Sequence, residues 1–298
     1  MNIGFCGIGR MGAAMVARML DQGQKPAIWN RSAEKAKPLI ERGAIWAASP
    51  AELAAKSDIV LSILIDDKAV REVYEGKNGL FSGDIAGKLF VEMSTVSPEL
   101  PQALAKAAKA KGAALLECPV GGTVGPARDG KLLGMAGGDA ADFARAKPVL
   151  DLVCRRVEHM GANGAGAAMK LAINLPLSIY WEALGEAVSL VQGFGIPPAK
   201  MMEVFGESSG GINGLKVRGP AVVATLETGK LPPQGFTVDG VRKDLHIMMD
   251  WAKHQGVKLP VLERALECYD QASRDGYSQS DNCAVLFHRL EQGKKKKG

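Results

Sequence analysis

The first half of the chain alternates short apolar runs with longer segments of helical periodicity. Five apolar runs predict β-strands, and they lie at residues 2–6, 26–29, 59–64, 88–93 and 113–118. Two of the segments between them, residues 10–22 and 97–112, repeat apolar residues at intervals of three and four, the spacing of one helix face. Strands that alternate with helices in this way predict β-α-β units around a parallel sheet.

The second half has a different pattern. Beyond about residue 163 the strand signals stop, and long stretches such as 167–194 and 241–255 carry helical periodicity. The sequence therefore predicts two domains, an α/β domain at residues 1–162 and an all-helical domain at residues 163–298.

Two prolines mark features of the predicted helices. Ser97 followed by Pro98 predicts a helix start, with Ser97 as the N-cap and Pro98 at the first helical position. Pro176 lies inside a helical pattern, where it removes one backbone hydrogen bond and predicts a local bend.

A glycine motif stands between the first predicted strand and the first predicted helix. Gly7, Gly9 and Gly12 have the spacing G-x-G-x-x-G, which permits a tight turn, a close approach of the backbone to a pyrophosphate, and close packing of helix on strand. The helix N-terminus adds N–H donors for phosphate oxygens. The motif predicts a dinucleotide site, with cofactor contacts from Gly7, Ile8, Gly9, Arg10, Met11 and Gly12.

The end of the second predicted strand indicates which dinucleotide is bound. An acidic residue there would bind the ribose 2′-hydroxyl of NAD, but this chain has Asn30. Arg31, Ser32 and Lys35 follow, and two cations with a hydroxyl suit a 2′-phosphate. We therefore expect NADP to be preferred over NAD. The alternative is that Ser32 only caps a helix and Arg31 is solvated.

Lys170 is the one charged residue between Gly161 and Trp181. Asn174 and Ser178 follow at intervals of one helical turn, so the three side chains form a polar stripe on an apolar helix. A partly desolvated lysine beside a nicotinamide suits proton transfer to or from a substrate oxygen. The alternative is that Lys170 extends to the surface along its apolar stem.

Composition restricts the possible partners. The chain has 298 residues, of which 47% are hydrophobic and 23% are charged, as is typical of a globular protein. The net charge is +5, but Lys294 to Lys297 supply four of the positive charges. Because neither an aromatic platform nor a basic helix accompanies this terminal run, we expect it to be solvated and expect no nucleic-acid partner.

Cysteine usage and the chain start bear on location. The five cysteines are scattered, form no CxxC pair and have no histidine at a ligand spacing, so we expect neither a metal site nor disulfides. Met1 leads directly into an apolar strand without a charged leader, which favours the cytoplasm. Lys170, Asn174 and Pro176 interrupt the most membrane-like stretch, residues 164–181, which favours a buried helix over a membrane span.

Several motifs in order resemble the β-hydroxyacid dehydrogenase family, which includes 3-hydroxyisobutyrate dehydrogenases, tartronate semialdehyde reductases and glyoxylate or succinic semialdehyde reductases. They are the glycine loop, VEMSTVSP at 91–98, ECPVGGTVGPARDGKLLGMAGG at 117–138, GAGAAMKLAIN at 164–174 and VRKDL at 241–245. The resemblance covers nearly the whole chain. It implies a Rossmann-like domain with a parallel-rich sheet, joined by a long helix to a helical domain like that of 6-phosphogluconate dehydrogenase, with the active site in the cleft between them.

The resemblance also implies roles for single residues. Lys170 is expected to be the catalytic acid or base and Asn174 to position the substrate, while Lys243 and Asp244 close the site from the C-terminal domain. Cofactor contacts are further expected from Leu64, Ile65, Ser94 and Thr95, the last two near the nicotinamide. Family members form dimers or tetramers through the helical domain, so we expect a homodimer or homotetramer.

Three positions depart from the family pattern, and they bear on the substrate. Gly121 replaces a serine that holds the substrate carboxylate, Thr123 replaces a glycine, and Ile173 replaces the first of two asparagines. Substrate binding is expected from Gly121, Gly122, Thr123 and Ser178, besides Lys243 and Asp244. Because losing a partner for a buried polar group changes discrimination strongly, these departures leave the substrate unnamed.

The sequence thus predicts an NADP-preferring oxidoreductase without a metal, which interconverts a small β-hydroxyacid and its semialdehyde. Two alternatives remain open. The same scaffold could act on an imine or on an anionic substrate that is not a carboxylate, or the chain could be a non-catalytic NADP-binding module.

Overall fold

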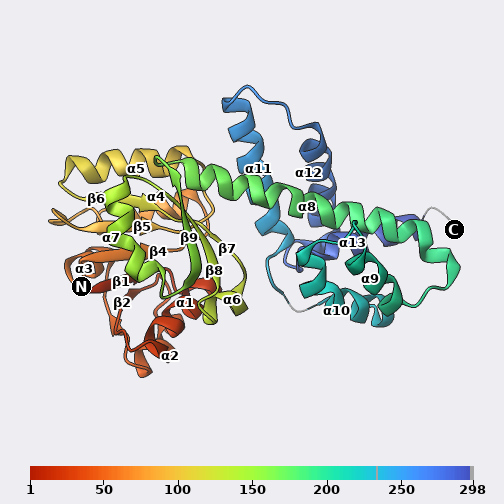
Figure 1. The fold of residues 1–298 in the computed structure, drawn as a ribbon, viewed down its shortest axis with the longest axis horizontal. Helices are drawn as coiled ribbons and strands as arrows, with labels where there is room; N and C mark the ends of the chain where they lie inside the picture. Colours follow the sequence, from red (N-terminus) through yellow and green to blue (C-terminus); the bar gives the residue numbers. More distant parts are fainter. Residues whose placement is uncertain (233, 296–298) are drawn as a thin grey trace. The chain divides into compact units, whose positions relative to one another are not determined.

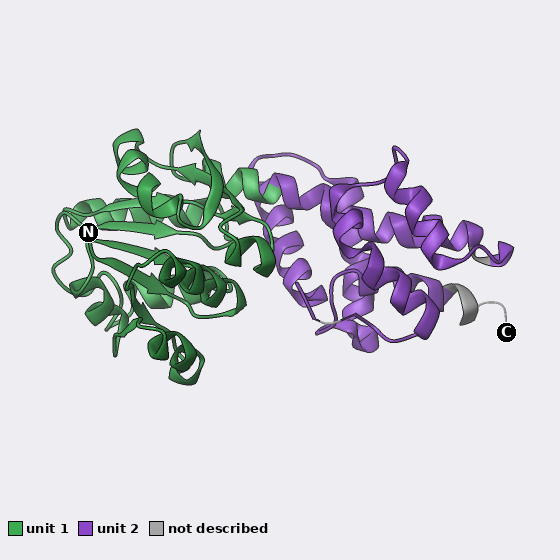
Figure 2. Ribbon diagram, turned by 60° about the horizontal axis from the view of Figure 1, so that its bottom comes forward, with its two compact units in different colours: residues 1–171 green, residues 172–298 purple. Residues whose placement is uncertain are grey.

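The computed structural model describes residues 1–232 and 234–295, and the chain divides into two compact units, residues 1–171 and 172–298 (Figure 2). The lysine run at 294–297, predicted to be solvated, falls on side chains outside the described part of the chain.

The first unit is built on one nine-stranded sheet (Figure 1). The strands are β1 (Ile3–Cys6), β2 (Ala27–Trp29), β3 (Ile45–Trp46), β4 (Ile59–Ser62), β5 (Leu89–Glu92), β6 (Ala114–Glu117), β7 (Val120–Gly121), β8 (Leu132–Gly137) and β9 (Cys154–Gly161). Their order is β3-β2-β1-β4-β5-β6-β8-β7, with β9 beside β8. All pairs from β3 to β6 are parallel, β8 runs antiparallel to β6 and β7, and β9 is parallel to β8. The predicted parallel-rich sheet is confirmed.

Helices cover this sheet, and both of its faces are buried. The helices are α1 (Arg10–Asp21), α2 (Lys37–Glu41), α3 (Pro50–Ala55), α4 (Asp67–Glu75), α5 (Glu99–Ala110), α6 (Val124–Arg128) and α7 (Ala140–Leu150). Neighbouring residues of β5 lie in different cores, since Val91 packs in one apolar cluster and Phe90 in the other. Strands buried on both faces explain why the sequence shows continuous apolar runs rather than alternation.

The second unit is helical. It comprises most of α8 (Ala165–Val191), then α9 (Pro198–Glu207), α10 (Asn213–Thr228), α11 (Val238–His254), α12 (Pro260–Ala272) and α13 (Ala284–Lys295). Within the described residues of this unit, β-pairing is limited to one isolated bridge between Thr237 and Asp281. The predicted all-helical second half is confirmed, and α8 runs without interruption through Pro176.

One predicted helix start is wrong. Helix α5 begins at Glu99, with Pro98 at the N-cap position, so Ser97 lies outside the helix. Its hydroxyl donates a hydrogen bond to the Asp67 carboxylate of α4 instead of capping α5. The Ser97 hydroxyl therefore bonds a residue of another helix, which the local sequence does not reveal.

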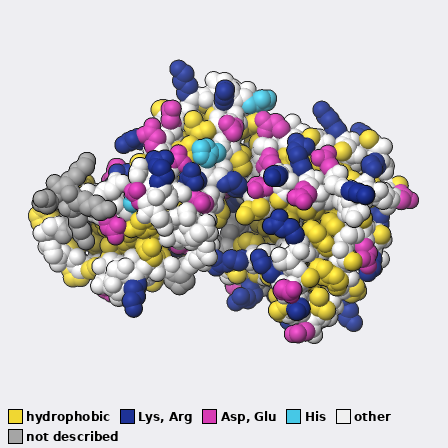
Figure 3. Space-filling view, turned by 180° about the vertical axis from the view of Figure 1, so that it is seen from behind, with side chains coloured by type: hydrophobic (Ala, Val, Ile, Leu, Met, Phe, Trp, Pro, Cys, Tyr) yellow, Lys and Arg dark blue, Asp and Glu magenta, His cyan; other side chains and the backbone are white. Residues whose placement is uncertain are grey.

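The described surface carries charges of both signs. On the face shown in Figure 3, basic and acidic side chains are interspersed among exposed apolar ones. Among the helices that the structure describes, none combines the length and apolar character that a membrane crossing requires.

Candidate active site

The glycine loop lies at the carboxyl end of β1, where α1 begins. Gly7 has a φ of +99°, and a Cβ atom there would overlap the Ile63 carbonyl oxygen. A Cβ atom at Gly12 would likewise overlap the Gly7 carbonyl oxygen. Among the described residues other than its chain neighbours, a Cβ atom at Gly9 would meet nothing within 4 Å. Packing within the protein thus explains the first and third glycines, whereas the second leaves open space against which a ligand can lie.

The start of α1 suits an anion. Gly9 is the N-cap residue and provides no side-chain cap, and the first turn contains no acidic residue. The backbone N–H groups of a first helical turn have no acceptor within the helix, and the helix dipole places positive charge there. Together with the space beside Gly9, this arrangement fits the pyrophosphate of a dinucleotide.

Asn30, at the end of β2, braces this loop. Its Oδ1 accepts a hydrogen bond of 2.9 Å from the Ile8 N–H, and its Nδ2 donates to the Ser32 carbonyl oxygen at 2.9 Å. Arg31, Ser32 and Lys35 are all exposed beside it. Ser32 precedes the 3₁₀ helix Ala33–Ala36 but makes no side-chain cap, so capping does not occupy its hydroxyl.

The ends of β4 and β5 are joined by the predicted cofactor residues. The Leu64 N–H donates to Ser94 Oγ at 2.7 Å, and the Ser94 side chain is buried. Thr95 is half-buried, and Ile65 is exposed. The structure thus brings Leu64 and Ser94 into direct contact.

A buried carboxyl that the sequence did not predict supports this junction. Glu92 is only 1% exposed, accepts a hydrogen bond of 2.7 Å from the Ser94 N–H and accepts another from Ser62 Oγ. The Tyr74 hydroxyl lies 2.7 Å from the same Ser62 oxygen. Burial raises the pKa of Glu92 to about 7, although these hydrogen bonds oppose the rise.

A second buried carboxyl lies on the next strand. Glu117 of β6 stands in register with Glu92 of β5 and is also 1% exposed. Burial raises the pKa of Glu117 to about 7, and the charge of Glu92 adds to the rise. The available signal in the sequence was an acidic residue near the end of each of two consecutive apolar runs, 88–93 and 113–118.

Helix α8 carries the predicted polar stripe. Lys170 and Asn174 are half-buried, and Ser178 is buried. Ser178 Oγ donates to the Asn174 carbonyl oxygen at 3.0 Å, so its hydroxyl proton is engaged within the helix. In the second unit, Asn174 Nδ2 donates to Asp244 Oδ2 at 3.2 Å, and Lys243 Nζ lies 2.7 Å from Asp244 Oδ1. The structure therefore groups Asn174, Lys243 and Asp244.

The predicted substrate-binding segment follows β6. Gly121 belongs to β7, and Gly122 has a φ of +131°, with Leu132 Cδ2 only 2.7 Å from the place of a Cβ atom. Backbone conformation therefore requires glycine at position 122. Thr123 is exposed at the start of α6 and makes no side-chain cap, which leaves its hydroxyl for other contacts.

The cysteines and the possible metal-binding side chains are alternative candidates for reactive groups. The five cysteines are free, and burial raises the pKa of the Cys6 and Cys118 thiols well above the usual value. Such thiols are poor nucleophiles. Within residues 1–232 and 234–295, His, Cys, Asp and Glu form no group of three suited to a metal ion.

Two family models together match most of the chain. The NAD-binding domain of 6-phosphogluconate dehydrogenase matches residues 2–161, and the NAD-binding domain of NADP-dependent 3-hydroxyisobutyrate dehydrogenase matches residues 164–288. The first unit thus contains a domain of a nicotinamide dinucleotide-binding family.

Relatives with known names match over nearly the same span. Glyoxylate/succinic semialdehyde reductase 2 of Arabidopsis thaliana is 32% identical over 96% of this chain and 78% of the relative. The 3-hydroxyisobutyrate dehydrogenase of Pseudomonas aeruginosa is 36% identical over 83% of this chain and 84% of its own. The 3-sulfolactaldehyde reductase of Escherichia coli is 33% identical over 95% and 94%.

Solved structures agree. A 3-hydroxyisobutyrate dehydrogenase from Salmonella typhimurium superposes with a TM-score of 0.85 at 29% identity, covering 96% of this chain and 99% of that one. Psf3 in complex with NADP+ and 2-OPP gives a TM-score of 0.84 at 27% identity, covering 95% and 98%.

Proposed function

The chain belongs to the β-hydroxyacid dehydrogenase family, and from this premise we propose that it is an NADP-preferring oxidoreductase that interconverts a small β-hydroxyacid and its semialdehyde. The observation that carries the proposal is Lys170, a half-buried lysine in an apolar helix, one turn from Asn174. A half-buried lysine on an otherwise apolar stretch of helix is placed to exchange a proton with a substrate oxygen.

The glycine loop holds the cofactor in this proposal. The space beside Gly9 admits the pyrophosphate, and Gly7 and Gly12 keep the turn tight. Exposed Arg31, Ser32 and Lys35 would hold the 2′-phosphate, while Asn30 supports the loop by accepting the Ile8 N–H. When bound, NADPH supplies the hydride for the carbonyl carbon.

In this proposal Lys170 is the proton donor and acceptor. In the direction of reduction, the protonated Lys170 amine gives its proton to the carbonyl oxygen, and the product is the hydroxyacid. In the direction of oxidation, the neutral amine takes the proton from the hydroxyl group. Asn174, held by Asp244, positions the substrate beside it.

A second candidate differs in the anion of the substrate. Gly121 stands where the family pattern has the serine that holds a carboxylate, and one relative is a 3-sulfolactaldehyde reductase. The backbone N–H of the exposed Gly122 and the exposed Thr123 hydroxyl would suit a tetrahedral anion, which needs donors from several directions. This candidate keeps the same reaction and the same role for Lys170.

A substrate panel tests both candidates. We expect three- and four-carbon semialdehydes that carry a carboxylate to be reduced faster with NADPH than with NADH, and faster than their sulfonate analogues. Preference for the sulfonates would select the second candidate. Reduction of cyclic imines without any aldehyde reduction would instead select the imine alternative, and tight NADPH binding without turnover would select the non-catalytic module.

The role of Lys170 has its own test. Lys170→Ala is expected to lower kcat by about 10³-fold or more while NADPH binding stays within about twofold, because the proton donor acts in the chemical step. Lys147→Ala is the matched control, since this exposed lysine pairs with Asp151 on the surface of the first unit. Undiminished turnover in Lys170→Ala would remove the proposed mechanism.

A further inference from the structure

The carboxylate of Glu117 binds the start of α8 directly. Its Oε1 accepts hydrogen bonds from the backbone N–H groups of Gly164, Gly166 and Ala167, at 2.8, 2.7 and 3.2 Å. The first N–H groups of a helix have no partner inside the helix, and a carboxylate there also interacts favourably with the helix dipole. One side chain from β6 therefore serves as the cap of a 27-residue helix.

Two glycines make room for this contact. A Cβ atom at Gly137 of β8 would overlap Glu117 Oε1, and one at Gly166 would overlap the Met135 carbonyl oxygen and lie 3.1 Å from Glu117 Oε1. Asn163 adds a second tie, since its Nδ2 donates to the carbonyl oxygens of Leu115 and Gly137, both at 3.2 Å. The first turn of α8 is thus held against β6 and β8 at close range.

This attachment lies one helical turn before Lys170. Residues four apart share one face of a helix, so Lys170 lies one turn after Gly166 on the same face of α8. Glu117 binds the N–H group of Gly166 at the start of that helix. The rise between Gly166 and Lys170 is about 6 Å. Since a helix is stiff over one turn, fixing Gly166 against the sheet fixes the Lys170 backbone as well.

We propose that Glu117 is a positioning residue for Lys170, because its carboxylate anchors the first turn of α8 to the sheet and so sets where the lysine amine lies. The inference rests on the proposed function, in which Lys170 transfers the proton. Glu117 acts through the helix backbone and needs no contact with substrate.

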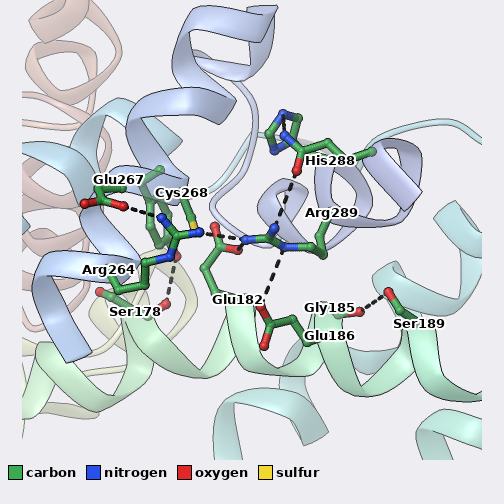
Figure 4. Close-up of polar contacts among 12 residues, drawn as sticks. Ser178, Glu182, Gly185, Glu186, Ser189, Arg264, Glu267, Cys268, His288 and Arg289 are labelled. Atoms are coloured by element: carbon green, nitrogen blue, oxygen red, sulfur yellow. Dashed lines mark hydrogen bonds and ion pairs between the residues drawn. The ribbon is translucent and has the colours of Figure 1, made fainter. Parts of the chain in front are cut away.

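Glu182 provides a matched comparison on the same helix. It is 7% exposed, and burial raises its pKa to about 7, as for Glu117. Its partner is a side chain, since Arg289 donates to Glu182 Oε2 at 3.3 Å and also to Cys268 Sγ at 2.9 Å (Figure 4). Removing Glu182 therefore tests the general cost of losing a buried carboxyl on α8 without disturbing its first turn.

Steady-state kinetics of three variants tests the proposal, with NADPH and the best aldehyde of the substrate panel. Glu117→Ala is expected to lower kcat by about 30-fold or more, with KM and NADPH binding within about twofold, because a displaced donor impairs the chemical step. Glu117→Gln keeps an acceptor oxygen and is expected to recover most of the loss, to within about fivefold of the wild type. Glu182→Ala is expected to leave kcat within about twofold.

Amide hydrogen exchange gives a readout independent of activity. In Glu117→Gln, residues 164–167 are expected to exchange about tenfold faster than in the wild type, because a neutral acceptor holds the three N–H groups less tightly. Exchange there is expected to stay unchanged in Glu182→Ala. Because this measurement uses Glu117→Gln, it tests the proposal even if Glu117→Ala does not fold.

Several outcomes would overturn the inference. They are an unchanged kcat in Glu117→Ala, a loss confined to KM, an equal loss in Glu182→Ala, or unchanged exchange at residues 164–167. Failure of the proposed function looks different, because Lys170→Ala would then stay active whatever Glu117 does.

Discussion

The glycine loop and the start of α8 are both rich in glycine, yet their glycines serve different ends. In the loop, Gly7 and Gly12 are required by contacts with nearby backbone, and Gly9 is left for a ligand. At the start of α8, a Cβ atom at Gly166 would overlap the Met135 carbonyl oxygen and would lie 3.1 Å from Glu117 Oε1, which accepts the Gly166 N–H. The loop therefore leaves space for a ligand, whereas the start of α8 leaves space for a carboxylate of the protein itself.

The largest expected effect distinguishes two glycines of the glycine loop. Gly12→Ala is expected to lower the free energy of unfolding by about 3 kcal/mol, or the Tm by roughly 10 °C, because the new Cβ atom overlaps the Gly7 carbonyl oxygen. Gly9→Ala is expected to change the Tm little but to weaken NADPH binding about tenfold or more. Thermal unfolding and NADPH titration of both variants check this, and equal effects of the two would erase the distinction.

The buried carboxyls of the first unit make the free energy of unfolding depend on pH. The pKa of Glu92 is raised to about 7 in the folded chain from its usual 4.5, so the folded state binds more protons than the unfolded state between these values. Its contribution to stability is therefore present below about pH 4.5 and is lost as the pH rises through about 7.

Glu92→Gln removes that titration. Between pH 5 and pH 8 the variant is expected to lose about 1 to 3 kcal/mol less stability than the wild type, as measured by urea unfolding at several pH values. Glu117 and Glu182 shift in the same direction, so a smaller slope should remain. An identical pH dependence in the wild type and in Glu92→Gln would contradict the raised pKa.

Substitution of Arg31 tests the proposed preference for NADPH over NADH. Arg31→Ala is expected to raise the KM for NADPH about 10- to 100-fold and to leave the KM for NADH within about twofold, because only NADPH carries the 2′-phosphate. Arg42→Ala is a suitable control, since this arginine pairs with Asp21 instead. Equal losses with both cofactors would show that Arg31 does not contact the 2′-phosphate.

The smallest expected effect compares two serines that precede helices. Ser49 Oγ accepts a hydrogen bond from the Glu52 N–H at 3.1 Å, whereas Ser32 makes no such cap. Ser49→Ala is expected to cost about 1 kcal/mol of stability, and Ser32→Ala less than about 0.3 kcal/mol. Ser32→Ala should instead raise the KM for NADPH roughly threefold. A stability loss in Ser32→Ala as large as in Ser49→Ala would favour the capping interpretation of Ser32.

Much of the fold could be predicted because its patterns are local. The five predicted strands and the change to helices near residue 163 appear in the structure, since both sheet faces and the helix faces are buried against apolar neighbours. Strands β3, β7, β8 and β9 were not predicted, because β3 and β7 have only two residues each, β8 is interrupted by glycine and β9 is mostly polar. Ser97 was misassigned for a related reason, since Asp67 of another helix competes for its hydroxyl.

The sequence by itself determined the glycine loop, the order of strands and helices, and the candidate lysine on an apolar helix. These follow from steric limits on the backbone and from burial periodicity over a few residues. Only the tertiary structure decided that Glu92 and Glu117 are buried side by side, that one supports the Ser94 turn, and that the other holds the start of α8. Such contacts join residues far apart in the chain, and a buried carboxyl is stabilised by partners that its neighbours in sequence do not specify.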